Sequence, residues 1–184
     1  MCLGFVSVEV PSELIFIIRY KIKKPPPPPL KLPSKQADRS LQQLISAARR
    51  GDARAVAGYL RIPFTDLNAG PYGDTVLIWA VRSGHTSVVK VLLEDERVDS
   101  NASNKTGNTP LIWATIGAIS KSRSRARAKA HQRNTGMGIV KVLLTDERVE
   151  VNRRNQDGDT AFILAVRNEC DATMRLLLAD ERTD

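Results

Sequence analysis

The feature that most constrains this chain is an internal repeat. The segment GDTVLIWAVRSGHTSVVKVLLEDERVDSN (73–101) returns in part as GNTPLIWATIG (107–117) and as GDTAFILAVRN (158–168), and its second half returns near 138–152 and 173–184. Equivalent threonines lie 34 and then 51 residues apart, which fits a unit of 34 residues with one insertion of 17. A period of this length predicts a solenoid, in which each unit buries its apolar face only against its neighbours.

Elementary helix rules explain the pattern within a unit. Thr109 is placed to cap a helix with its hydroxyl, and Pro110 suits the first helical position because its missing N–H needs no partner there. Gly84 is expected to end the first helix of its unit with a positive φ, and a second helix is expected over Thr86–Leu93. Each unit is therefore predicted to be a turn followed by a helix pair.

The repeated residues resemble the ankyrin repeat. Its pattern G-x-T-P-L-H-x-A is similar to 107–114 of this chain, and the G-H and I-V-x-x-L-L that follow are similar to 84–85 and 88–93. The resemblance covers roughly 41–184 and implies an all-α ankyrin-repeat solenoid of helix-turn-helix units joined by turn or hairpin fingers. The units are placed at about 41–69, 70–103, 104–154 and 155–184.

The first 40 residues are predicted to be a disordered segment ahead of the repeats. They contain a run of five prolines, Pro25–Pro29, which must adopt polyproline II. Two interpretations of this run are open: a ligand for an SH3- or WW-type reader, or a stiff spacer, and the spacer is favoured. Ser40 and Gln43 form a capping box, so the first helix is expected to begin at Leu41 and to open an N-terminal capping unit over 41–68.

Positive charge is concentrated outside the repeats. The chain carries a net charge of +8, of which residues 1–40 contribute +4 and Ala118–Asn134 contribute +6. In this basic insertion, an extension of either neighbouring helix is expected before the chain turns at Asn134–Gly138. It is interpreted either as a solvated loop or as a site for nucleic acid, an anionic membrane or an acidic protein. The candidate polyanion-binding residues are Lys121, Arg123, Arg125, Arg127, Lys129 and Arg133.

Some positions depart from the ankyrin pattern. Isoleucines 78, 112 and 163 replace the usual histidine of the turn network, which predicts looser turns. Glu169 stands where Gly84 stood, so either Asn168 takes the left-handed conformation or the helix ends differently. Trp79 and Trp113 lie one period apart and are interpreted as core between repeats rather than as a ligand cage.

Little in the sequence suggests catalysis. His85 is explained by the repeat and His131 lies in the basic insertion, and no phosphate loop, zinc spacing or nucleophile beside a base is present. The D-E-R triplets at 95, 146 and 180 are interpreted as a repeated connection between helices. We therefore expect no enzymatic activity, cofactor or metal. Two cysteines far apart suit a reducing intracellular compartment, either cytoplasm or nucleus.

The resemblance implies binding of a partner protein through the turn tips and the concave face of the first helices. Carried onto this chain, the candidate partner-binding residues are Tyr72, Asp74, Arg82, Ser83, Lys105, Asn108, Asp157, Asp159 and Arg167. The apolar Leu176–Leu178 of the last unit is expected to be partly uncovered, which predicts either a truncated array or self-association through this edge.

Overall fold

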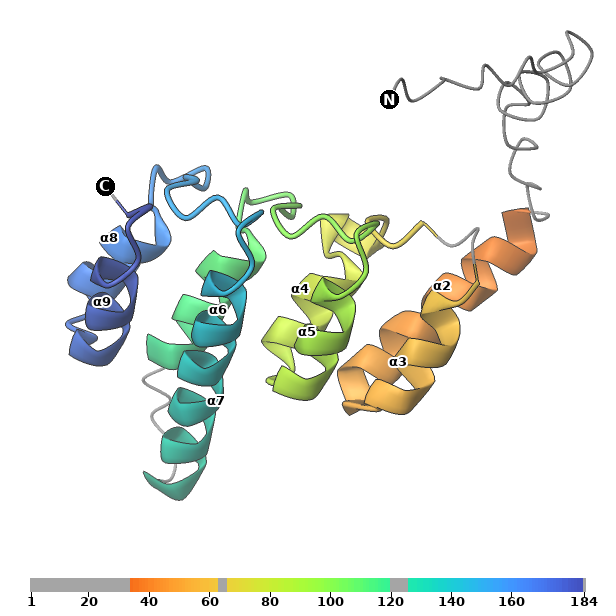
Figure 1. The fold of residues 1–184 in the computed structure, drawn as a ribbon, viewed down its shortest axis with the longest axis horizontal. Coiled ribbons are helices and arrows are strands. Elements are labelled where there is room, and N and C mark those ends of the chain that lie inside the picture. Colours follow the sequence, from red (N-terminus) through yellow and green to blue (C-terminus); the bar gives the residue numbers. More distant parts are fainter. Residues whose placement is uncertain (1–33, 63–65, 120–125, 184) are drawn as a thin grey trace, which may run out of the picture. The chain divides into compact units, whose positions relative to one another are not determined.

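The computed structural model describes residues 34–62, 66–119 and 126–183. Within these ranges the chain forms helices and turns and contains no strand (Figure 1). The predicted N-terminal segment, including Pro25–Pro29, lies outside the described residues apart from its last seven. The helices are α2 (Ser34–Arg50), α3 (Ala53–Leu60), α4 (Val76–Arg82), α5 (Thr86–Leu93), α6 (Pro110–Ile119), α7 (Ala126–Leu144), α8 (Ala161–Arg167) and α9 (Asp171–Leu178), with a short 3-10 turn, η1, at Pro71–Gly73.

The helices pair and stack in two layers. The first helices of successive pairs, α2, α4, α6 and α8, pack on one another, and the second helices α3, α5, α7 and α9 do the same. Between the layers lies a continuous apolar core, in which Leu77, Leu111 and Ala165 of the first helices meet Val88 and Leu143 of the second. The predicted all-α solenoid of helix-turn-helix units is therefore confirmed.

Threonine caps set the start of three first helices. The hydroxyls of Thr75, Thr109 and Thr160 accept hydrogen bonds from the backbone N–H three residues later, at 3.3, 3.2 and 3.1 Å. Pro110 is the first residue of α6, as predicted. These bonds satisfy an N–H that would otherwise lack a helical partner.

Each of the three described links between the two helices of a pair contains a left-handed residue. Gly51 and Gly84 both have φ of +79°, as the pattern predicts. In the last pair Glu169 itself takes this conformation, with φ of +52°, while Asn168 remains at −104°. Neither of the two alternatives expected from the sequence holds: Glu169 rather than Asn168 is left-handed, and α8 ends at the position equivalent to the end of α4. A side chain at such a φ costs about 1–2 kcal/mol.

Replacing Glu169 with glycine is expected to raise the free energy of unfolding by about 0.5–1 kcal/mol. Glycine removes the left-handed strain but loses more backbone entropy on folding, so the gain is smaller than the strain. Urea unfolding followed by circular dichroism measures it. Glu169→Ala keeps the strain and removes the charge, so it should change stability by less than about 0.5 kcal/mol; an equal gain in both variants would contradict the backbone explanation.

The first helix begins earlier than the capping box predicts. α2 starts at Ser34, so Ser40 and Gln43 lie inside the helix and do not cap it. The predicted start at Leu41 is therefore wrong. Burial of Leu44, Ala47 and Ala48 against the next pair fixes the register of α2, and its polar N-terminal residues continue the same helix.

The insertion lengthens both helices beside it, as predicted. α6 has ten residues and α7 has nineteen, whereas α4 and α5 have seven and eight. The expected turn at Asn134–Gly138 is wrong, because α7 passes through these residues without a break. Gly136 serves packing instead: a Cβ there would lie 2.4 Å from the backbone nitrogen of Ala118 in α6. Figure 1 shows α7 extending past its neighbours on the side away from the interhelical fingers.

Candidate functional site

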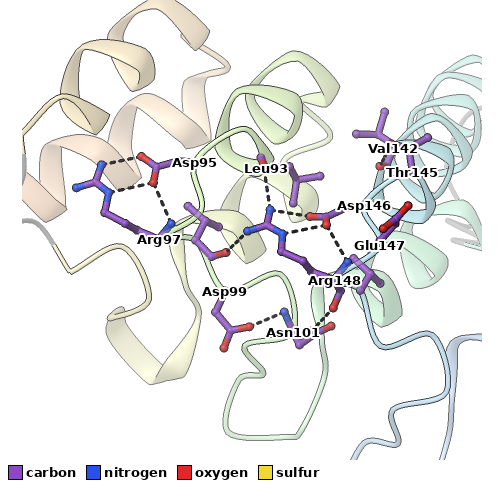
Figure 2. A network of polar contacts seen from close by, with 12 residues as sticks. Leu93, Asp95, Arg97, Asp99, Asn101, Val142, Thr145, Asp146, Glu147 and Arg148 are labelled. Atoms are coloured by element: carbon purple, nitrogen blue, oxygen red, sulfur yellow. Dashed lines mark hydrogen bonds and ion pairs between the residues drawn. The ribbon is translucent and has the colours of Figure 1, made fainter. Parts of the chain in front are cut away.

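A ladder of arginines joins successive repeats along the ends of the second helices (Figure 2). Arg148 donates from Nε and Nη2 to the Asp146 carboxylate at 3.0 and 2.8 Å, and Nη2 also donates to the carbonyl oxygen of Leu93 in the preceding repeat at 2.8 Å. Arg97 and Arg182 repeat this arrangement one unit earlier and one unit later. The D-E-R triplets are thus structural connections, and each also binds the repeat before it.

Asparagines complete the ladder. The side chain of Asn101 donates to the Arg148 carbonyl oxygen at 2.6 Å and accepts from the backbone N–H of Glu150 at 2.7 Å. Asn68 makes the same two contacts with Arg97 and Asp99. This bridging role of the asparagines was not predicted from the sequence, although both lie eight residues after the last leucine of a second helix. That constant spacing is the signal that identifies them.

The ladder lowers the pKa of its carboxyl groups. Hydrogen bonds from the Arg97 side chain hold the pKa of Asp95 below its ordinary value, and those from Arg182 do the same for Asp180. Burial is the largest single influence on Asp146 and raises its pKa, but the hydrogen bonds and positive charge of Arg148 together outweigh it and lower the pKa. The aspartates are therefore ionised partners of a structural ion pair, with no sign of an acid–base role.

A broad groove lies between the second helices α5 and α7, beside this ladder. It encloses about 1000 Å³ and is lined by apolar Leu93 and Val142 together with charged groups of both signs. The charged residues of its lining include Glu94, Glu147 and Lys90. Mixed charge of this kind favours no single ligand class.

The fingers between repeats are held by asparagine side chains. Asn104 Oδ1 accepts from the backbone N–H groups of Thr106 and Asn108, at 3.0 and 3.1 Å, and Asn155 does the same one repeat later. Asn155 Nδ2 also donates to Asn108 Oδ1 at 2.9 Å, which ties the two fingers together. These bonds lie in the turns that were predicted to be looser because isoleucine replaces the usual histidine. The looser turns remain a prediction.

The candidate partner-binding residues fall into two groups by burial. Tyr72 is 76 % exposed on the finger of the second repeat, and Lys105 lies beside it with its Nζ 5.5 Å from the ring centroid. Ser83 and Asp157 are also exposed, and the side chain of Arg167 is 63 % exposed. These side chains are available to a partner.

The second group supports the first. Asp74 and Asp159 are buried and form ion pairs with Arg82 and Arg167, the latter at 2.6 Å. Asn108 is half-buried in its contact with the next finger. The two aspartates hold exposed arginines and Asn108 holds the next finger, while one oxygen of the Asp74 carboxylate, Oδ1, is buried without a hydrogen-bond partner among the described residues.

Two tryptophans and two arginines form a continuous row across the first helices, which we call the Arg–Trp row. The guanidinium of Arg49 lies 4.8 Å from the Trp79 ring centroid, and that of Arg82 lies 5.0 Å from Trp79 and 4.6 Å from Trp113. Both indoles are half-buried and pack against the core, which agrees with the core interpretation. The sequence analysis did not identify the row, although Arg82 follows Trp79 by three residues on one helix face.

The basic insertion and the C-terminal edge are only partly described. Lys121, Arg123 and Arg125 lie outside the described residues, whereas Arg127, Lys129 and Arg133 belong to the first half of α7. At the C-terminal edge Leu177 is buried, but Leu178 is 64 % and Val166 is 47 % exposed. Binding of polyanions and self-association stay predictions.

Two features are absent from the described residues. No cluster of three or more His, Cys, Asp or Glu side chains in these ranges is placed to hold a metal ion. Over the same residues, no helix combines the length and the apolar character needed to span a membrane.

Comparisons with known proteins agree with the architecture. A family model described as ankyrin repeats (3 copies) matches residues 44–121. Alpha-latrocrustotoxin-Lt1a of Latrodectus tredecimguttatus is 30 % identical over 108 residues, which are 59 % of this chain and 7 % of the toxin. The crystal structure of EF0377, an ankyrin repeat protein, is 28 % identical with a TM-score of 0.61, over 74 % of this chain and 62 % of that chain. This chain therefore spans less than two thirds of either relative.

Proposed function

This chain carries ankyrin repeats, and on that premise we propose that it is an adaptor that binds a partner protein through its fingers and the exposed side of its first helices. Ankyrin repeats are generally protein–protein interaction modules. That this chain binds a particular partner protein is our proposal. We propose no enzymatic role. The proposed binding surface consists of Tyr72, Arg82, Ser83, Lys105, Asp157 and Arg167.

The observation that carries the proposal is that exposed side chains at equivalent positions of the second and fourth repeats are held by ion pairs. Arg82 and Arg167 occupy equivalent positions and are each held by a buried aspartate, Asp74 and Asp159. Side chains that are already ordered lose less conformational entropy when a partner binds. Tyrosine and arginine are also enriched among the residues that contribute most to protein interfaces.

The proposal is tested with the full chain as bait for proximity labelling, followed by affinity measurements with the purified partner. Tyr72→Ala on a finger and Ser83→Arg at the end of α4 should each weaken binding at least about ten-fold, because both alter exposed contacts without touching the core. Lys90→Ala is the matched control, since Lys90 is exposed on the second helix α5. Equal weakening by the control, or no weakening by the first two variants, would refute this surface.

A second candidate function is polyanion binding through the basic insertion. Its support is the six Lys and Arg residues without an acid in Ala118–Asn134. The Arg123→Ala, Arg125→Ala, Arg127→Ala triple variant separates the two functions in the same assay. Binding through the insertion should disappear in this variant and fall steeply with salt, whereas partner binding through the fingers should persist.

A further inference from the structure

The Arg–Trp row has an unusual arrangement of charge. Arg49 is exposed at the end of α2 and forms no ion pair with any described residue. Arg82 has an acidic partner, but Asp74 is buried beneath it and the Arg82 side chain remains 36 % exposed. The Asp74 carboxylate beside the row is thus buried, whereas the guanidinium groups of Arg49 and Arg82 belong to exposed side chains.

Contact with the indole rings restricts the positions of these guanidinium groups. Arg49 and Arg82 both lie within 5.0 Å of the Trp79 centroid, and Arg82 also contacts Trp113. A guanidinium over an aromatic ring keeps the N–H groups at its edge, where they can bind a carboxylate in bidentate fashion. Because the two arginines are ordered in advance, binding costs less side-chain entropy.

The two arginines lie close enough together for one extended peptide to reach both. Since both lie over the same ring, their guanidinium groups are at most on the order of 10 Å apart. Residues i and i+2 of an extended chain are about 7 Å apart and place their side chains on the same side. Two carboxylates at that spacing could each contact one guanidinium.

Resting on the proposed function, we infer that the Arg–Trp row binds an acidic, extended segment of the partner protein, with carboxylates two residues apart paired to Arg49 and Arg82. Nucleic acid fits this row less well. Bases stack on open aromatic faces, whereas guanidinium groups already lie over both indole rings.

Intrinsic fluorescence of the full chain tests the inference, because the only two tryptophans of the sequence, Trp79 and Trp113, both belong to the row. The probe is a ten-residue peptide of alternating glutamate and glycine, and its control replaces every glutamate with glutamine. We expect a saturable fluorescence change with the acidic peptide only. A decamer of thymidylate is titrated in parallel.

Arg49→Gln should weaken acidic-peptide binding at least five-fold. It should lower the melting temperature by no more than about 4 °C, because only the contact of the guanidinium with Trp79 is lost and the backbone carbonyl of residue 49 still contacts His85. Arg82→Lys should also weaken binding, since it keeps a cation beside Asp74 but loses the planar fork. Arg54→Gln, on the exposed side of α3, is the matched control and should bind as the native chain does.

Three outcomes would overturn the inference: equal binding of the glutamine peptide, native affinity in Arg49→Gln, or tighter binding of the thymidylate decamer at this row. The proposed function is judged separately. A partner whose binding depends on Tyr72 and Ser83 but not on Arg49 would refute the acidic-segment inference and leave the proposed function intact.

Discussion

Replacing Arg148 with alanine is expected to lower the free energy of unfolding by about 2 kcal/mol. The guanidinium joins Asp146 to carbonyl oxygens of the preceding repeat, and the Asp146 side chain is only 12 % exposed. Without Arg148 a largely buried carboxylate loses its cation and the link between two repeats is broken. The Arg148 side chain is itself 39 % exposed, so water partly replaces its contacts. The expected loss of stability is therefore near the lower end of the range for hydrogen bonds to charged groups. Urea unfolding measures it.

Arg153→Ala is the matched control for this prediction. Arg153 also forms an ion pair, with Glu150 at 3.2 Å, but both side chains are well exposed, at 41 % and 61 %. An exposed pair of this kind contributes about 0–1 kcal/mol, so the loss should be much smaller than for Arg148. Similar losses in the two variants would show that the ladder has no special role in stability.

The effect of Arg148→Ala should also depend on pH. Because the folded pKa of Asp146 lies below its ordinary value, its stabilising contribution is present above about pH 4 and is lost as the pH falls through the folded pKa. The stability difference between native and variant chains should therefore shrink as the pH falls below about 4. A constant difference over this range would contradict the assigned ion pair.

Replacing Gly136 with alanine is expected to lower the free energy of unfolding by about 1–3 kcal/mol. A Cβ at this position would lie 2.4 and 2.7 Å from backbone atoms of Ala118, so α6 and α7 must move apart to admit it. This contact lies between helices, where the sequence analysis expected a turn. Urea unfolding of the full chain, followed by circular dichroism, measures the change.

Gly58→Ala provides a control of opposite sign. Gly58 lies inside α3, and a Cβ there would meet nothing within 4 Å. Alanine should therefore raise stability by about 0.5–1 kcal/mol through its higher helix propensity. If Gly136→Ala proved neutral or stabilising as well, close packing of α6 against α7 at that residue would be excluded.

Local rules in the sequence predict the repeat architecture because each repeat contains the same signals in the same order. The cap at Thr109, the proline at Pro110 and the left-handed glycine at Gly84 act within a few residues, so they can be recognised without knowing the rest of the fold. Helix α5 accordingly occupies Thr86–Leu93, the range predicted. Repetition at a constant period then predicts stacking, since each unit needs a neighbour to cover its apolar face.

Features that depend on contacts between distant residues could not be predicted in the same way. Ser40 forms a plausible capping box, yet α2 begins at Ser34; Gly136 reads as a turn residue, yet α7 runs through it against α6. In both cases the local signal is ambiguous, because the same residue types occur at helix ends and inside closely packed helices.

In the candidate site, too, some features follow from the sequence and others depend on contacts between distant residues. Sequence by itself determined which positions recur, and the resemblance to ankyrin repeats implied that Arg82, Arg167 and Tyr72 belong to a shared surface, which remains a prediction. Only the tertiary structure decided that Asp74 and Asp159 are buried beneath the two arginines, and that Arg49 and Arg82 lie over Trp79. Ion pairs and ring contacts depend on distances of a few ångströms between helices, and the stacking of whole repeats sets those distances.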